Sequence, residues 1–408
     1  MTNWPHPEGV HGNKRKGRRA FPRRSDLTSA VSFEAPDKTN GQTRRRWTAG
    51  TLLAALLVVL LVARGWLPRH WLHPQPAPLS ARVHVPGTDV PYPRSPSAPP
   101  DPFDAHAMAA PPSVERSFST LVPYLVQGAG GDRQKARAIF TWIASRVAYD
   151  IDGMRRGICE QHPQEVLAGR VTDCVGFARL FVRMAVAAGL KAEIVDGCYK
   201  ALEGRHLGRP AAGIPAAYGL WYTHHVWNAV RIDGHWSLVD CCFGSHRRKA
   251  GGQVTGDSSP VMDHFLPDPS LFIYTHLPYQ VRWQLLAKPV RPTDHPLLPI
   301  LWSPFFDSGL QLEHGQHALI PCGSHLDLRV IAPDDVDVTG LIAPMDKIDS
   351  LTRLDSKRAG DRVVLSGDLP GRGRYLLYLY AAHGVQADEE VAAEFLVVSK
   401  PPAVRPSR

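Results

Sequence analysis

The chain has 408 residues, of which 44% are hydrophobic, and this is enough apolar material to fill more than one core. Its formal net charge of +9 is concentrated at one end: residues 1–46 hold eleven Lys or Arg against four Asp or Glu (+7), which leaves 36 against 34 (+2) elsewhere. A nearly neutral folded region argues against a dedicated nucleic-acid-binding protein, so no specific nucleic-acid binding is expected. The basic tail 1–46 is predicted to be disordered, although contact with acidic lipid or nucleic acid stays open.

A single transmembrane helix is predicted at residues 47–66. It begins WTAGTLLAALLVVLLVA, seventeen residues without a charge, which can cross a bilayer as a helix. A cleaved secretory signal is the alternative, but the forty-six residues before the apolar run are long for a signal, and no small-residue cleavage site is evident. Because eleven basic residues precede the span, we expect the tail in the cytoplasm. Everything from Leu67 onward is then expected on the far side, in a periplasm or an extracellular or lumenal space.

Residues 67–113 are predicted to form a stalk. Thirteen prolines occur among the 45 residues 68–112, and such a composition stiffens the chain and prevents packing. The folded part is expected to begin near Val114, with a first domain over residues 114–300.

Two amphipathic helices are predicted in that domain. The first lies in residues 132–150, with Asp132 as its N-cap. Its apolar residues at helical spacing are Ala136, Ile139, Phe140, Ile143 and Val147. The second lies in residues 171–190, with Thr172 or Asp173 as N-cap and Gly189 at the C-terminal stop.

One cysteine, Cys174, falls in the first turn of the second helix. The unpaired backbone N–H groups and the helix dipole favour an anion there, so a thiolate is stabilised and the same amides can face an oxyanion. Gly176 is expected to leave room for a substrate backbone. The alternative is that Cys174 is a small core residue, which is the more common role of a lone cysteine at a buried helix end.

A β-hairpin is predicted in residues 223–244, THHVWNAVRIDGHWSLVDCCFG. Two strand-like runs flank Asp-Gly at 233–234, a pair typical of two-residue hairpin turns. With such a turn Ile232 faces His235, and the register of the whole hairpin follows. A bulge in the turn would shift that register by one residue.

The register selects one of two adjacent histidines. Trp227 opposes Asp240, and His225, two residues before Trp227, lies on the same face and diagonal to Asp240 at roughly 7 Å, which the two side chains can bridge. His224 points to the other face. His225 and Asp240 therefore supply the base and the acid that a nucleophilic Cys174 needs.

The order of these motifs resembles the transglutaminase-like superfamily. The resemblance rests on D-C-x-G-F-A-x-L-F at 173–181, H-x-W-N-A-V at 225–230 and L-V-D at 238–240. It implies a papain-like fold with a Cys-His-Asp triad. Matched position by position, the nucleophile is Cys174, the histidine His225 and the aspartate Asp240.

A closer likeness is to the kyphoscoliosis peptidase group. It rests on KARAIFTWIASRVAYD, AGLKAEIVDGCYK and DHFLPDPSLFIYTHLPYQVRWQLL, and it covers about residues 115–300. Relatives often have small or hydroxyl residues and then Trp after the aspartate, whereas this chain has Cys241, Cys242 and Phe243. The segment 206–224 before the histidine is long for a strand connection, so it is either a lid or a surface loop.

From Gln311 onward apolar and polar residues alternate between turn residues. Residues 301–399 are predicted to form a β-sandwich of immunoglobulin-like type, followed by a disordered tail at 400–408. The fold class is therefore α+β: a transglutaminase-like core and a C-terminal β-sandwich, preceded by one transmembrane helix. Histidines outside the hairpin motif are interpreted as surface residues.

The predicted function is that of a membrane-anchored thiol enzyme acting on amide bonds of a peptide or protein substrate. An acyl-enzyme on Cys174 would pass its acyl group to water, as in a peptidase or amidase, or to an amine. The triad chemistry requires no metal and no other cofactor. The alternative is a catalytically inactive binding or scaffold protein that keeps the fold.

Overall fold

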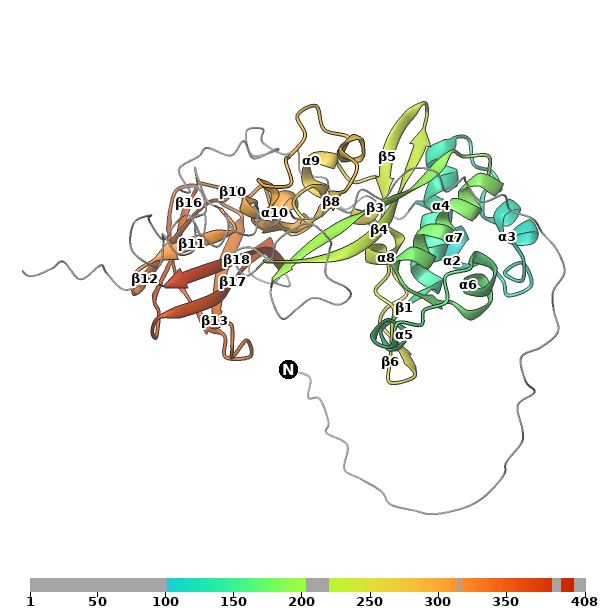
Figure 1. Ribbon diagram of the computed structural model, residues 1–408. Helices are drawn as coiled ribbons and strands as arrows, with labels where there is room; N and C mark the ends of the chain where they lie inside the picture. Colours follow the sequence, from blue (N-terminus) through green and yellow to red (C-terminus); the bar gives the residue numbers. More distant parts are fainter. Residues whose placement is uncertain (1–100, 203–219, 314–316, 384–389, 400–408) are drawn as a thin grey trace, which may run out of the picture. The chain divides into compact units, whose positions relative to one another are not determined.

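The computed structural model of the protein describes residues 101–202, 220–313, 317–383 and 390–399 (Figure 1). The predicted cytoplasmic tail, the transmembrane helix at 47–66, the stalk up to residue 100 and the tail at 400–408 lie outside the described residues, as does most of the segment 206–224. Among the residues that are described, no helix is both long enough and apolar enough to cross a membrane.

Helices are concentrated in the first half of the described chain. The α-helices are α2 Pro102–Met108, α3 Phe118–Leu125, α4 Asp132–Arg146, α5 Ile151–Arg156, α6 Pro163–Gly169, α7 Cys174–Ala187, α8 Cys241–Gly244, α9 Pro269–Phe272 and α10 Ser303–Asp307. Short 3₁₀ turns are η2 Met262–His264, η3 Val281–Gln284 and η4 His295–Leu297.

The strands in the described part of the chain form four sheets. The strands up to residue 278 are β1 Ala148–Asp150, β2 Val171–Thr172, β3 Ala192–Leu202, β4 Leu220–Ile232, β5 His235–Val239, β6 Arg248–Ala250, β7 Gln253–Thr255 and β8 His276–Pro278. The later strands are β9 Ile300–Leu301, β10 Gln311–Leu312, β11 Leu319–Cys322, β12 His325–Ile331, β13 Val336–Pro344, β14 Thr352–Arg353, β15 Asp355–Ala359, β16 Arg362–Asp368, β17 Gly373–His383 and β18 Glu390–Ser399.

Folded structure begins earlier than the predicted boundary at Val114, because α2 lies within the range predicted as stalk. Asp101 caps α2, and its side chain accepts a hydrogen bond from the Phe103 amide at 2.9 Å. Asp104 accepts a hydrogen bond from Arg137 Nε at 2.9 Å, which ties α2 to α4. The prolines of this stretch are compatible with a helix because one of them occupies its first turn, where no helical partner for its missing N–H is needed.

Helices α4 and α7 form the core of the predicted first domain (Figure 1). The apolar residues predicted to share a face of α4 are all buried. The helix is shorter than the periodic stretch, because its C-cap is Val147 and a strand follows. Its N-cap is Gly131 rather than Asp132, which occupies the first helical position.

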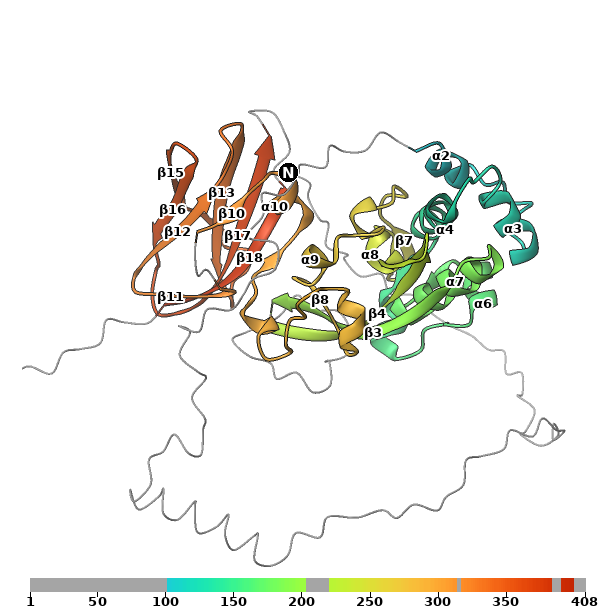
Figure 2. The ribbon, with the colours of Figure 1, turned by 90° about the horizontal axis from the view of Figure 1, so that it is seen from above.

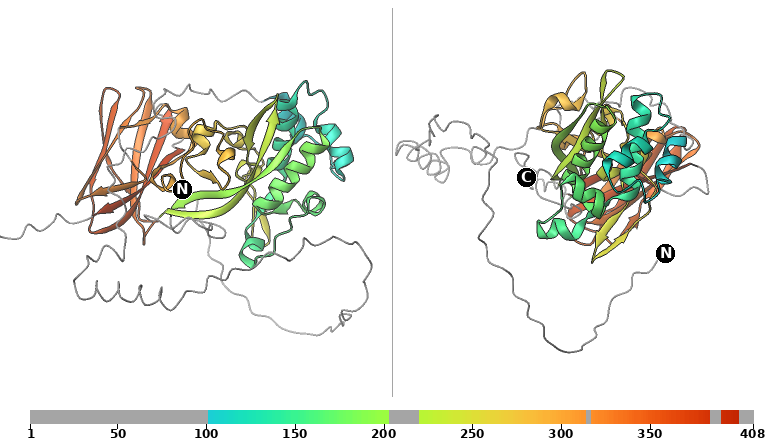
Figure 3. Two further views of the ribbon diagram at one scale, coloured as in Figure 1. Left: turned by 45° about the horizontal axis from the view of Figure 1, so that its top comes forward. Right: turned by 90° about the vertical axis from the view of Figure 1, so that its right-hand side faces the viewer.

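The central sheet has the strand order β5-β4-β3-β8, and α7 packs on β4 and β3 (Figure 3, left). Side chains of β4 alternate between two cores. Val226 and Val230 join the core of α4 and α7, whereas Trp227 and Ala229 pack with Phe272 on the other side. A second sheet, β2-β1-β6-β7, brings the chain to the start of α7.

The C-terminal region contains two sheets, β10-β12-β16-β15 and β11-β18-β17-β13-β14 (Figure 2). Apolar residues of β12 and β16 share one core with those of β17 and β18, so the two sheets pack face to face as a β-sandwich. Strand β9 pairs with β18, so the second sheet already includes Ile300, before the predicted start at residue 301. The immunoglobulin-like type stays a prediction.

The buried Lys200 anchors β3 to the last residues of the predicted first domain. Lys200 is fully buried, and its Nζ donates to the backbone oxygens of Leu298 at 2.7 Å, His295 at 3.2 Å and Pro299 at 3.3 Å. Burial lowers the pKa of Lys200 well below its usual range. The three carbonyl oxygens match the three donors of an ammonium group, which opposes this effect.

Replacing Lys200 by methionine should lower the free energy of unfolding by about 3 kcal/mol, because a buried set of hydrogen bonds to a charged group is lost. Chemical denaturation of the purified chain measures this change. Lys191→Met, at an exposed lysine just before β3, is the matched control and should have little effect. Equal midpoints for the two variants would contradict the anchoring role.

Candidate active site

Cys174 is the first residue of α7, directly after the N-cap Asp173. The Asp173 side chain accepts a hydrogen bond from the Gly176 amide at 3.1 Å, so the helix begins where the sequence predicts. Cys174 is 8% exposed, so the residue lies at the edge of the core rather than deep inside it. The helix N-terminus favours negative charge at this position.

Gly176 does not leave room for a substrate, in contrast to the prediction. A Cβ atom at this position would collide with the side chain of Thr172 and lie 3.1 Å from the backbone oxygen of Glu160. The space in front of Gly176 is therefore occupied by the Thr172 side chain of β2 and by the loop at Glu160. A glycine is required at position 176 because helix α7 and the loop at Glu160 approach each other closely.

Two further polar residues lie near the start of α7. Gln161 Nε2 donates to the Asp173 carboxylate at 2.6 Å, which joins the preceding loop to the helix cap. Burial raises the pKa of Tyr149 far above its usual range, and the nearby acidic groups of Cys242 and Cys174 act in the same direction. Tyr149 therefore keeps its O–H donor at any working pH.

The hairpin adopts the predicted register. Asp233 and Gly234 both have positive φ, 47° and 87°, as a two-residue turn of type I′ requires. Pairing runs from Ile232 opposite His235 to Asn228 opposite Val239, without a bulge. The strand ladder ends one residue before Asp240, which follows β5 as the N-cap of α8.

The three predicted site residues are connected by hydrogen bonds. His225 Nε2 lies 2.6 Å from Asp240 Oδ2, and the Cys174 side chain makes a hydrogen bond to His225. His224 points away, as predicted, and its Nε2 lies 2.7 Å from Asp196 Oδ1 at the surface. Residues distant in sequence are thus brought together as sulfur, imidazole and carboxylate.

Asp240 also caps α8, which the sequence analysis did not predict. Its Oδ1 accepts hydrogen bonds from the amides of Cys242 at 2.8 Å and Phe243 at 3.0 Å. Its Oδ2 faces His225 and, at 3.2 Å, His276 Nε2. One fully buried carboxylate therefore ends β5, starts α8 and binds two imidazoles.

The charges of this cluster follow from its contacts. Burial opposes a charge on His225, but the Asp240 carboxylate and the hydrogen bonds to Asp240 and Cys174 raise the pKa of His225 to about 10. Burial likewise opposes a charge on Asp240, yet His225 and His276 hold the pKa of its carboxyl well below the usual range. Burial lowers the pKa of His276 to about 4, against the hydrogen bond to Asp240. Near neutral pH the cluster thus holds an imidazolium, a carboxylate and a neutral imidazole.

Histidines outside the hairpin motif were predicted to lie at the surface, and for His276 and His295 this is wrong. Both are buried: His276 contacts Asp240, and His295 bridges the Tyr222 hydroxyl at 2.8 Å and the Ile273 carbonyl at 2.6 Å. His276 begins β8, which pairs with β3, and that position on a central sheet was the signal available for burial.

Aromatic rings enclose the imidazoles. The ring centroids of Tyr199 and Phe243 lie 5.7 and 5.0 Å from that of His225, both edge-on. Trp227 stacks on His225 at 5.7 Å. These rings exclude water from the histidine and strengthen its interaction with Asp240.

Three of the described residues also place metal-ligand atoms together. One ligand atom each from His225, Asp240 and His276 lies within 4.8 Å of the others, and two imidazoles with a carboxylate form a set that zinc accepts. Both Nε2 atoms, however, already lie within hydrogen-bonding distance of the same Oδ2. The three side chains therefore satisfy one another by hydrogen bonds, and triad chemistry needs no metal.

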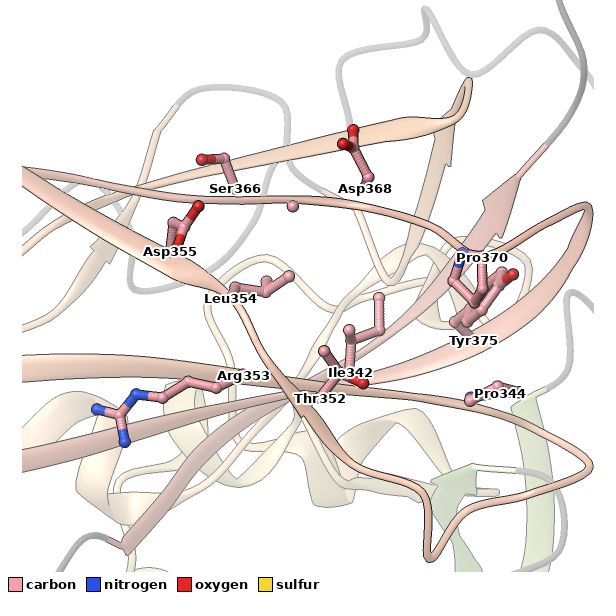
Figure 4. A pocket seen from close by; sticks show the side chains of 11 residues that line it. Ile342, Pro344, Thr352, Arg353, Leu354, Asp355, Ser366, Asp368, Pro370 and Tyr375 are labelled. Atoms are coloured by element: carbon pink, nitrogen blue, oxygen red, sulfur yellow. The ribbon is translucent and has the colours of Figure 1, made fainter.

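The other cysteines and one cavity do not contribute to this site. All six cysteines of the sequence lie in the described part of the chain, and each is free, so no disulfide blocks Cys174. A cavity of about 210 Å³ lies in the C-terminal sandwich, where Leu354, Asp355 and Tyr375 line it (Figure 4). None of the three triad residues lines that cavity.

The free energy of unfolding should be greatest near pH 6.5. Unfolded His276 takes up a proton near pH 6.5, but the folded residue does so only near pH 4. The free energy of unfolding therefore falls by about 3 kcal/mol as the pH drops from 6.5 to 4. His264 and His295, whose pKa values burial also lowers, act in the same direction. The contribution of His225 is complete below pH 6.5 and is lost as pH rises to about 10, whereas that of Asp240 is lost only below its ordinary pKa of 3.8.

Urea denaturation at about pH 5, 6.5 and 9 measures this profile. A His276→Gln variant should flatten the acid side by removing one of the three buried histidines that resist protonation. A wild-type profile that is level between pH 5 and 6.5 would contradict the buried, neutral state of these histidines.

Residues 119–241 match the protein family described as the transglutaminase-like superfamily. The chain is 30% identical to kyphoscoliosis peptidase of Mus musculus over 220 residues, which are 52% of this chain and 31% of that protein. It is also 30% identical to kyphoscoliosis peptidase of Homo sapiens over 211 residues, 51% of this chain and 30% of that protein. The matches thus span about a third of the length of these relatives. A solved structure of a TGase is similar at 17% identity and a TM-score of 0.23, over 39% of this chain and 38% of that chain.

Proposed function

Because residues 119–241 belong to the transglutaminase-like superfamily, as the motifs predicted, and the chain is similar to kyphoscoliosis peptidases, we propose that it is a thiol enzyme acting on amide bonds. Its substrate is a peptide or protein, and the acyl-enzyme forms on Cys174. The observation that supports this most directly is the hydrogen-bonded chain Cys174, His225, Asp240.

The first half-reaction forms the acyl-enzyme. His225 binds Asp240 through Nε2, which leaves Nδ1 for the sulfur of Cys174. The imidazolium of His225 holds the Cys174 sulfur as a thiolate, which attacks the carbonyl carbon of the substrate amide. The carbonyl oxygen becomes an oxyanion, which the first-turn amides of α7 and the helix dipole stabilise. Collapse of this intermediate breaks the C–N bond, and His225 gives the proton to the leaving amine.

The second half-reaction releases the acyl group. His225 removes a proton from a water molecule or a primary amine, which then attacks the thioester carbon. The C–S bond breaks, the sulfur leaves as a thiolate while His225 keeps the proton as an imidazolium, and the product is an acid or a new amide. Asp240 keeps the imidazole aligned and stabilises its positive charge in both halves.

Mass spectrometry of a peptide library incubated with the chain and a primary amine tests the proposal. Cleavage, deamidation and amine incorporation each give a distinct mass change, so the assay also separates a peptidase from an acyltransferase. All changes should disappear in Cys174→Ala. A wild-type chain that leaves the library and protein substrates unchanged, while still binding peptides, would favour the scaffold alternative.

We also propose that residues 47–66 anchor the enzyme in a membrane, with residues 1–46 in the cytoplasm and the catalytic region on the other side. The uncharged apolar run and the eleven basic residues before it support this arrangement. Protease digestion of intact cells or spheroplasts should remove the catalytic region and spare the N-terminal tail. Recovery of the intact chain in the fraction that is soluble without detergent would contradict the anchor.

A further inference from the structure

The carboxylate of Asp240 has a second imidazole partner that the triad scheme does not use. His276 Nε2 lies 3.2 Å from the same Oδ2 that accepts the hydrogen bond from His225 at 2.6 Å. The other nitrogen of His276, Nδ1, lies 2.8 Å from the hydroxyl oxygen of Thr275. Both nitrogens of this buried ring are therefore engaged.

The protonation state of His276 makes it a donor to Asp240. Since its pKa is lowered to about 4, the ring is neutral at working pH and carries one proton. An ionised carboxylate only accepts hydrogen bonds, so the proton is on Nε2, and Nδ1 accepts from Thr275. The titratable groups facing the ring are Asp240, which favours its protonation, and His225 and His264, which oppose it. A neutral donor stabilises the carboxylate without competing with the charge of His225.

The His276 ring is held in place by packing as well as by hydrogen bonds. Phe272 stacks on it with centroids 3.8 Å apart and an interplanar angle of 11°. Trp227 and Phe243 meet it edge-on at 5.3 and 5.1 Å. A ring fixed on three sides keeps its Nε2 directed at Asp240.

We infer that His276 is a positioning residue for the triad: its Nε2–H holds Oδ2 of Asp240 in the orientation that aligns His225 with Cys174. This inference rests on the proposed thiol chemistry. Two backbone amides hold Oδ1, and without His276 only His225, which must exchange protons, holds Oδ2. His276 thus fixes the carboxylate of Asp240, and His225 is left to move the proton.

The test compares two amide replacements of His276 in the full chain. A glutamine amide nitrogen reaches about the position of Nε2, whereas an asparagine amide reaches only about that of Nδ1. The measured quantity is the rate of Cys174 alkylation by iodoacetamide against pH, with peptide mass spectrometry to separate Cys174 from the other five cysteines. His276→Asn should lower the rate near pH 6 by about 10- to 100-fold, the effect of losing a hydrogen bond to a charged group.

His276→Gln should restore the rate to within about threefold of wild type, because the donor to Asp240 is retained. His264→Asn is the matched control. The His264 ring lies 6.4 Å from that of His276, but it is not one of the four groups that donate to the Asp240 carboxylate among the described residues. This variant should therefore leave the pH profile unchanged. Equal profiles for the asparagine and glutamine variants would overturn the inference. If instead wild-type Cys174 itself reacts like an isolated thiol, with the same profile as His225→Ala, the proposed thiol chemistry fails rather than the role of His276.

Discussion

Replacing Asp240 by alanine is expected to lower the free energy of unfolding by about 3–5 kcal/mol, the cost of leaving a buried charge without its partner. The alanine would leave the His225 imidazolium, the His276 N–H and two amides of α8 without an acceptor. Urea denaturation near pH 6.5 measures the loss. A change below about 1 kcal/mol would contradict the account of Asp240 as the centre of this cluster.

Asp240→Asn separates the structural task from the chemical one. Its carbonyl oxygen can still accept from the amides of α8, so much of the stability should remain. The amide N–H₂ of the asparagine then faces two imidazoles. To accept its hydrogen bond, His225 must present the Nε2 lone pair and carry its own proton on Nδ1. With Nδ1 protonated, His225 cannot take a proton from Cys174. The alkylation rate of Cys174 near pH 6 should therefore fall by about 10²- to 10⁴-fold.

Replacing His225 by alanine should abolish the fast alkylation of Cys174 at low pH, with a loss of about 10²- to 10⁴-fold near pH 6. The reason is that the imidazolium beside the sulfur, which persists to about pH 10, stabilises the thiolate. Iodoacetamide labelling followed by mass spectrometry measures the rate. Amine incorporation and peptide cleavage should be lost in parallel.

The adjacent His224 provides the matched control for this experiment. It lies on the same strand but points to the surface, where its Nε2 contacts Asp196. His224→Ala should therefore alkylate at the wild-type rate and unfold at the same urea concentration. A loss in His224→Ala as large as that in His225→Ala would contradict the assignment of the base.

Local signals in the sequence pointed to the three residues that the structure brings together. Asp173 and the apolar repeat located the start of the helix, and with it Cys174. The Asp-Gly turn fixed the hairpin register, because a two-residue loop without a bulge leaves one pairing only, and this distinguished His225 from His224. The order of the same motifs resembles that of the transglutaminase-like superfamily, and the family match to residues 119–241 confirms this resemblance.

Features that depend on long-range packing could not be predicted in this way. His276 is buried because β8 pairs with β3, nearly eighty residues earlier in the chain, and because Phe272 covers it. Helix α2 is ordered because Asp104 finds Arg137 on α4. Gly176 was predicted to leave room for a substrate, whereas the Thr172 side chain and the loop at Glu160 fill that space. In each case the deciding contact leaves no periodic or turn pattern at the residue itself.

The double role of Asp240 has a consequence for inhibition of the protein. Any compound or substitution that unwinds α8 would withdraw two hydrogen bonds from Oδ1 and free the carboxylate to rotate, even though it touches none of the reacting atoms. A ligand that binds between Phe243 and its aromatic neighbours would therefore lower the reactivity of the Cys174 thiol by misaligning Asp240, without competing with substrate. Selective inhibitors of the proposed activity can be sought at this aromatic cluster instead of at the reactive sulfur.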